Sequence, residues 1–237
     1  MNYSRTVLLL LCGFFLAACE PSGEMSASDE APADAAAENG SSEAMTDAAE
    51  MQPAAPIAQT TTQASLLSEP EWAILFAGHD LTSFNAVGEA EWNIIDDYVE
   101  ADGYTGSFLV TRGHYTDFLL QAEFWPGANS NSGIFIRNGD PQAISAMGGY
   151  EINIYDTNEN LDNRTGSIVG HQPPMVEVLT EEQWNTYEIT AQGNRITVML
   201  NGTLTADLED DTHASGPIAF QNNGGLIRFR NLRIRPL

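Results

Sequence analysis

The chain has 237 residues, of which 33 are acidic and nine are arginines, and it contains no lysine. Its formal net charge of −24 at pH 7 argues against binding to nucleic acids or anionic membranes, which attract basic proteins. Cys12 and Cys19 are its two cysteines, so the chain beyond them has neither a disulfide nor a thiolate metal site. From residue 66 onward there are still 24 acidic residues and eight arginines, so the acidity extends into the region that folds.

Residues 1–18 have the features of a lipoprotein signal peptide. Arg5 precedes an apolar run, Val7 to Leu16, that is too short for an ordinary membrane-spanning helix. The following Leu16-Ala17-Ala18-Cys19 resembles a bacterial lipobox. We expect Cys19 to carry acyl chains and to be the only membrane contact of a lipoprotein on the periplasmic or cell-surface side of the outer membrane. The alternative is an ordinary secretory signal that contains cysteines.

Residues 19–65 form an acidic linker rich in Ala, Ser and Pro. Between residues 20 and 65 there are nine acidic residues, no basic residue and no aromatic residue. Such a composition buries too little apolar area to offset the entropy lost on folding. We therefore expect a disordered tether that separates the anchor from a folded domain at residues 66–237.

The region from residue 72 to the end consists of short strand-like runs separated by turn residues, with no long helical pattern. Asp102-Gly103 and Asn201-Gly202 have the chemistry of hairpin turns. Many short strands with frequent turns predict an all-β sandwich or barrel. The predicted strands are Trp72–Phe76, Trp92–Ile95, Ser107–Thr111, Asp117–Trp125, Gly133–Arg137, Tyr150–Tyr155, Trp184–Gln192, Arg195–Leu200, Pro217–Gln221 and Leu226–Arg235.

Two central runs alternate with the period of a half-buried strand. In Tyr150–Tyr155 the two isoleucines and Tyr150 share one face, whereas Glu151, Asn153 and Tyr155 share the other. In Gly133–Arg137, Arg137 falls opposite the isoleucines. We expect Arg137, Glu151 and Asn153 to meet on one polar sheet face, although a wet outer face without function has the same pattern.

The last predicted strand changes phase. Ile227 and Phe229 occupy odd positions, but Leu232 and Ile234 occupy even ones. One extra residue near Asn231 would keep all four on the core side, so we predict a β-bulge there.

Four blocks resemble, in order, the motifs of the 3-keto-disaccharide hydrolase family, formerly the domain of unknown function 1080. The blocks are NSGIFIR, GYEINIYD, EEQWNTYEITAQGNRITVMLNG and GPIAFQNNGGLIRFRNLRIRPL, preceded by a weaker match in WAILFAGHDLTSF. The resemblance covers residues from about 70 to the end. It implies a two-sheet antiparallel jelly roll like concanavalin A and laminin-G domains. It also implies substrates that are glycosides already oxidised to a ketone at sugar carbon 3.

The implied chemistry begins with the ketone, which acidifies the hydrogen on carbon 2. A base removes that proton, the aglycone leaves carbon 1, and water adds to the resulting enone. The reaction needs a base at carbon 2, a donor at the carbon 3 oxygen and an acid at the leaving group.

The candidate catalytic residues are Glu151, Arg137, Asp156 and His171. Glu151 lies beside two aromatic residues, where partial desolvation would raise the pKa of its carboxyl group, although a surface glutamate is the alternative. Asp156 reaches the same face only if the strand ends or bulges first. Arg137 is a cationic donor for oxygen atoms, and His171 is a loop acid or base or simply a solvated histidine.

The candidate substrate-binding residues supply amide, guanidinium and aromatic groups to a sugar. For Arg230 an ion pair with a nearby acid is an equal alternative. These candidates are Asn153, Tyr155, Gln221, Arg230 and Trp125. Where the family shows Gln-Asp-His-Gly, this chain has Gln221-Asn222-Asn223-Gly224, so two ionisable positions are amides.

We therefore carry three hypotheses: an enzyme acting on 3-keto-glycosides, a non-catalytic carbohydrate-binding domain, and an adhesive or structural lipoprotein. The spacing of side chains predicts no metal site and no cofactor. The loop from Asp156 to Asp162 has oxygen ligands for a structural calcium ion, but an Asn/Asp turn explains it equally well.

Overall fold

The computed structural model describes residues 71–237. The expected signal peptide, Cys19 and the tether lie outside these residues. Within residues 71–237 no helix is long and apolar enough to cross a membrane.

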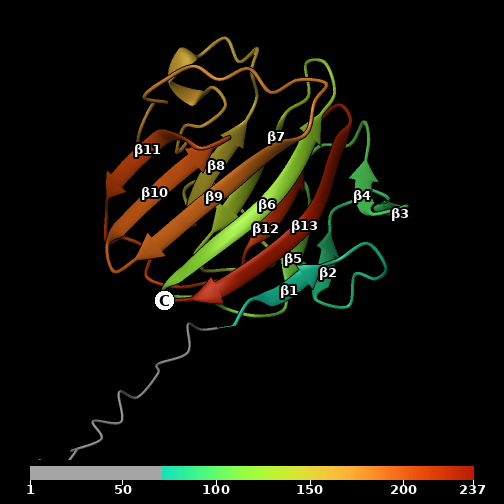
Figure 1. Ribbon diagram of the computed structural model, residues 1–237, viewed down its shortest axis with the longest axis horizontal. Helices are drawn as coiled ribbons and strands as arrows, with labels where there is room; N and C mark the ends of the chain where they lie inside the picture. The colour runs from blue at the N-terminus through green and yellow to red at the C-terminus, as the bar shows by residue number, and fades with distance from the viewer. Residues whose placement is uncertain (1–70) are drawn as a thin grey trace, which may run out of the picture. The chain divides into compact units, whose positions relative to one another are not determined.

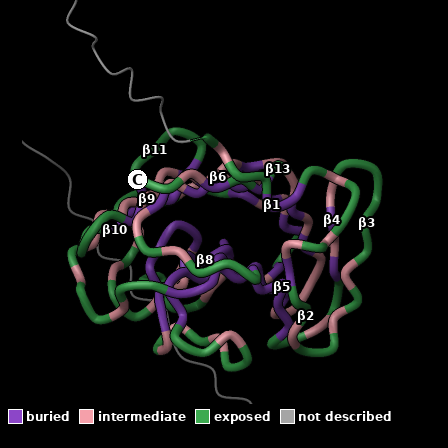
Figure 2. The backbone as a smooth tube through the Cα atoms, turned by 90° about the horizontal axis from the view of Figure 1, so that it is seen from below, coloured by how far each residue is buried: buried purple, intermediate pink, exposed green. Residues whose placement is uncertain are grey.

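The described chain folds into two antiparallel β-sheets packed face to face, which confirms the predicted jelly-roll sandwich (Figure 1). Figure 2 shows that the buried residues lie mainly where the two layers face each other. Sheet A has the order β11-β10-β9-β6-β13-β4-β3, with β1 also paired to β13, and sheet B has the order β2-β5-β12-β7-β8. The strands are β1 (Ala73–Phe76), β2 (Phe84–Val87), β3 (Asn93–Ile95), β4 (Tyr98–Ala101), β5 (Ser107–Thr111), β6 (Phe118–Pro126), β7 (Ser132–Ile136), β8 (Tyr150–Ile154), β9 (Asn185–Gln192), β10 (Arg195–Leu200), β11 (Thr203–Glu209), β12 (Ala219–Asn222) and β13 (Ile227–Pro236), with a short 3-10 helix, η1 (Leu161–Asn163).

The core arises from strict alternation along the long strands. In β6 the even positions from Phe118 to Phe124 are buried and the odd positions are half-buried. Phe124 stacks on Tyr187 of β9 with ring centroids 4.7 Å apart, and Phe220 of β12 meets Phe229 of β13 edge-on at 5.2 Å. The second of these pairs joins sheet B to sheet A through the core.

One turn prediction is wrong. Asp102-Gly103 does not close a hairpin, because it connects β4 in sheet A to β5 in sheet B. The hairpin in this region lies earlier, between β3 and β4, and turns at Asp96, whose φ is 51°. Aspartate tolerates this left-handed conformation, so the turn forms without a glycine.

The predicted β-bulge in the last strand is confirmed. The pairing of β13 with β6 shifts between Arg230 and Arg233, and Asn231 has a φ of 51°. The extra residue keeps Ile227, Phe229, Leu232 and Ile234 all buried. The β-bulge therefore allows all four apolar side chains to remain in the core.

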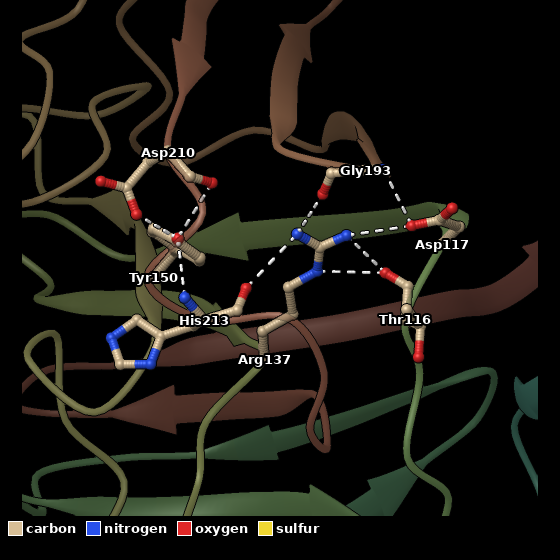
Figure 3. A network of polar contacts seen from close by, with 7 residues as sticks. All are labelled: Thr116, Asp117, Arg137, Tyr150, Gly193, Asp210 and His213. Carbon is tan, nitrogen blue, oxygen red and sulfur yellow. Dashed lines mark hydrogen bonds and ion pairs between the residues drawn. The ribbon is translucent and has the colours of Figure 1, made fainter.

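Arg137 does not join the polar face of Glu151, so that prediction is wrong. Arg137 has a φ of 55° directly after β7, and this turns its side chain away from the alternation of the strand. The side chain is 1% exposed, and its guanidinium donates to the carbonyl oxygens of Thr116 (2.6 Å) and Gly193 (2.9 Å) (Figure 3). It also lies 3.2 Å from the Asp117 carboxylate. Because β7 belongs to sheet B and Asp117 precedes β6 of sheet A, Arg137 ties the two sheets together.

We expect Arg137→Met to lower the free energy of unfolding by about 2–5 kcal/mol, because the hydrogen bonds and the ion pair that the buried guanidinium makes between the two sheets would be lost. Urea unfolding followed by tryptophan fluorescence measures this change. Arg195→Met is the matched control: Arg195 is exposed and pairs with Asp207 on the surface, so its loss should cost below about 1 kcal/mol. Equal losses in both variants would show that Arg137 does not hold the sheets together.

Candidate active site

The outer face of sheet B carries Glu151, as the alternation of β8 predicts. Tyr150, Ile152 and Ile154 are 0% exposed and point into the core, which leaves Glu151 and Asn153 on the opposite face. In the register with β7, Glu151 lies opposite Phe135 and Asn153 lies opposite Gly133.

The Glu151 side chain leans across β7. A Cβ atom added at Gly133 would lie 3.1 Å from Glu151 Oε1, so the carboxyl group occupies the space above this glycine. Next to it lies a buried apolar cluster of Phe108, Val110, Phe135 and Ala219, against which Ile144 packs. Burial raises the pKa of Glu151 to about 7.

Glu151 differs from the other acids that are at least partly buried between residues 71 and 237. Each of the others has a hydrogen bond or an ion pair, for example Asp156 with Thr180, Glu123 with Arg230 and Glu188 with Gln121. The Glu151 carboxyl group has neither within this part of the chain. A desolvated carboxyl group without a fixed protein partner is available to exchange protons with a ligand.

Gln221 lies on the same face as Glu151. It follows Phe220, which pairs with Ile134, so Gln221 lies beside Gly133 on β7. Its backbone carbonyl accepts a hydrogen bond from Ser132, but its side-chain amide makes none within residues 71–237, and Oε1 is buried without a partner. The structure therefore brings Glu151 and Gln221 to adjoining positions, with Gly133 between them.

The outer edge of β8 is covered by residues 165–169. The Val169 amide donates to the Glu151 carbonyl at 2.9 Å, and the Asn153 amide donates to the Ser167 carbonyl at 3.1 Å. The Ser167 hydroxyl is buried without a partner in the described chain. Sequence reasoning missed Ser167 and the role of Gly133. Only the position of Gly133 within the NSGIFIR block gave a signal for either.

Asn153 and Asp156 hold loops in place. The Asn153 side chain donates to the carbonyl of Asn163 at the end of η1. Asp156 is 7% exposed and accepts hydrogen bonds from Thr165, Thr180 and Glu181, so it fastens the end of β8 to the segment before β9. Asp156 therefore does not turn toward Glu151. The half-buried Tyr155 follows β8 directly, and its amide donates to Thr165.

Arg230 and Trp125 lie on the outer face of sheet A, across the sandwich from Glu151. Arg230 stacks on Trp184 at 4.0 Å and pairs with Glu123 at 2.7 Å, which is the ion-pair alternative. Arg228 covers the Trp125 ring at 4.5 Å. These two candidates therefore cannot contact the same sugar ring as Glu151.

His171 lies beyond the segment that covers the edge of β8. It is exposed, and its ring centroid is 5.2 Å from that of Tyr150. Together with Asn160, Asp162 and Asn163 it lines a hollow of 250 Å³. The histidine is thus near the strand of Glu151 but on the edge of the sheet.

The two asparagines that replace Asp-His have structural roles. Asn222 is 0% exposed, accepts from the Tyr104 amide and donates to the carbonyls of Ala101 and Gly225. Asn223 accepts from the Gly106 amide. Both side chains therefore fix the loops at this end of sheet B.

Within residues 71–237 no group of three or more His, Cys, Asp or Glu side chains is arranged to hold a metal ion. In the loop considered for calcium, both Asp156 carboxylate oxygens already accept hydrogen bonds from protein groups. The outer face of sheet B carries the carboxyl group of Glu151 and the side-chain amide of Gln221.

Comparisons with known proteins agree with this architecture. Two solved structures from Parabacteroides distasonis, both of proteins proposed to be glycosyl hydrolases, superpose with TM-scores of 0.62. They are 19% and 25% identical to this chain, cover 70% of it in each case, and are themselves covered to 94% and 100%. No curated protein sequence matches the chain. Residues 71–235 match the family described as the 3-keto-alpha-glucoside-1,2-lyase-like domain, and the chain belongs to that family.

Proposed function

We propose that this domain cleaves the glycosidic bond of 3-keto-glycosides and that Glu151 is the proton-transferring residue. One observation carries the proposal: Glu151 is a partly buried carboxyl group with no protein partner within residues 71–237, on a sheet face that also carries an unpaired amide. Membership of the family supports the substrate class.

Ionised Glu151 takes the hydrogen from carbon 2 as a proton, and the electrons of the C–H bond form an enolate with the carbon 3 ketone. Collapse of the enolate expels the aglycone oxygen from carbon 1, and that oxygen takes the proton that Glu151 had accepted, which restores the carboxylate. Water then adds its hydroxyl to carbon 1 and a proton to carbon 2, which restores the 3-keto sugar. With a pKa of about 7, Glu151 is ionised often enough to accept the proton and basic enough to hold it.

Gln221 is suited to the carbon 3 oxygen. Its amide nitrogen has no acceptor within the described chain, so it is free to donate to an oxygen that gains negative charge. Because Gly133 has no side chain, the Glu151 carboxyl group can lie over β7, toward this amide. The apolar cluster at Phe135 excludes water from one side of the carboxyl group and so strengthens its basicity.

The second candidate is a non-catalytic carbohydrate-binding domain. It is favoured by the amides at Asn222 and Asn223, which are held in structural hydrogen bonds and do not titrate. The two functions differ in one result, because a binding domain retains the sugar without releasing an aglycone.

We expect Glu151→Gln to lower the rate of aglycone release by about 10²–10⁴-fold, because an amide of the same shape cannot accept the proton. The measurement is release of p-nitrophenol from a 3-keto-glucoside by the purified chain. Glu209→Gln, which makes the same change at an exposed position at the end of β11, should leave the rate unchanged. Full activity in the Glu151 variant would exclude Glu151 as the base. Binding without release by the wild type would favour the second candidate.

We expect kcat/KM for the same substrate to rise as the pH increases through about 7, because only the ionised form of Glu151 accepts a proton. A pH series between about 5 and 9 measures the profile. A rate that falls through this window would instead show that the protonated carboxyl group acts as an acid.

The same carboxyl group should make stability depend on pH without any substrate. Its pKa is raised from an ordinary value of 4.5 to about 7, so between these values the folded state binds the proton more tightly than the unfolded state. The free energy of unfolding should therefore fall by at most about 3 kcal/mol as the pH rises through this window. Urea unfolding at each pH measures the fall, and Glu151→Gln should remove this component. Identical pH dependence in both proteins would show that the carboxyl group is not desolvated.

A further inference from the structure

A hollow of 370 Å³ lies on sheet A, across the sandwich from Glu151. It sits where β1, β6 and β13 meet at the β-bulge of Asn231. The pairing of β1 with β13 is also irregular here, between Ile74 and Phe76. Two irregularities in strand pairing therefore occur at the same place on the outer surface of sheet A.

The lining of the hollow combines polar and apolar groups. Its polar members offer two amides, a carboxylate, a guanidinium and a hydroxyl, from Gln121, Asn231, Glu123, Arg233 and Thr186. Its exposed apolar members are Ile74, which is 57% exposed, and Ala77, whereas Leu232 and Ala122 beneath them face the core. A pyranose ring has the same division, since its hydroxyl groups form a polar rim around faces of C–H bonds.

The polar side chains are held in position before any ligand arrives. Glu123 accepts from Asn231 at 2.8 Å and from Arg230 at 2.7 Å. Gln121 accepts from Arg233 at 2.6 Å and donates to Glu188 at 2.6 Å. These bonds fix the rotamers on rigid strands, which lowers the entropy lost on binding. Asn231 Oδ1 and Thr186 Oγ1 have no partner within residues 71–237 and are free for a ligand.

The charge around the hollow favours a neutral ligand. Half of the eight arginines beyond residue 66 lie on β13, at positions 228, 230, 233 and 235. Among the residues that line the hollow, the carboxylate of Glu123 and the guanidinium of Arg233 balance each other. This local balance contrasts with a chain whose net charge is −24, which repels acidic polymers elsewhere.

We propose that this hollow is a second, non-catalytic carbohydrate site that binds a neutral, unoxidised pyranose. It is independent of the proposed reaction, because none of its lining residues belongs to sheet B. The volume falls in the range of about 300–1,000 Å³ that is usual for ligand sites. The domain would then hold a glycan on one sheet and act on a 3-keto-glycoside at the other.

The test is to titrate the purified full chain with maltose, cellobiose, trehalose and sucrose in turn. Saturation-transfer difference NMR detects the binding of each sugar. At least one disaccharide should bind the wild type. Ala77→Trp, which places a large ring at the edge of the hollow, should weaken that binding more than tenfold. Thr186→Val, which removes one hydroxyl group with little change in shape, should weaken it about three- to tenfold.

Thr190→Val is the matched control, because it makes the same change on the outer side of β9 outside this hollow. It should leave the affinity unchanged, and so should Glu151→Gln. No binding of any of the four sugars to the wild type would overturn the proposal. The proposal would also be overturned if Glu151→Gln abolished sugar binding while Thr186→Val and Ala77→Trp left it intact. The sugar would then lie on sheet B.

Discussion

The carboxyl group of Glu151 is partly buried because its neighbours along β8 are buried. Packing of Tyr150, Ile152 and Ile154 in the core fixes the strand so that Glu151 cannot turn inward or away. The carboxyl group therefore lies against the surface of β7. The absence of a side chain at Gly133 leaves space for it, and Phe135 shields it from water. The free energy that desolvates this group comes from burial of its apolar neighbours, and the raised pKa is the result.

The two outer faces differ in whether their charged side chains form ion pairs. On sheet A, Arg228 pairs with Glu100 and stacks on Trp125, and Arg230 pairs with Glu123 and stacks on Trp184. Such pairs neutralise one another and hold side chains in fixed positions. On sheet B, Glu151 has no pair within the described chain. A paired face suits recognition of a shape, whereas an unpaired acid suits the transfer of a proton, which fits the division of roles that we propose.

The pattern of apolar and polar residues predicted the structural features that depend on one strand alone. The alternation of β8 predicted the outward position of Glu151, and the phase change in β13 predicted the bulge at Asn231. The failures concern how distant strands come together. A positive φ at Arg137 turned its side chain toward Thr116, Asp117 and the β9–β10 turn, and a single dihedral angle of this kind leaves no periodic pattern in the sequence. Trp125 could not be assigned to the opposite face from Gln221, because sheet membership is decided by long-range pairing.

The position of Asn222 bears on how many groups can move protons on sheet B. Its oxygen and its nitrogen are occupied by backbone groups, so restoring an acid there would also break the loop contacts at Tyr104 and Gly225. Asp156 is likewise held by its donors. One carboxyl group can serve as base and then as acid when it passes the accepted proton to the leaving group, and a ketone beside carbon 2 stabilises the carbanion that forms in between. The loss of ionisable groups at 222 and 223 is therefore compatible with an enzyme whose substrate has been oxidised beforehand, and it would disable one that had to break the glycosidic bond of an unoxidised sugar with paired carboxyl groups.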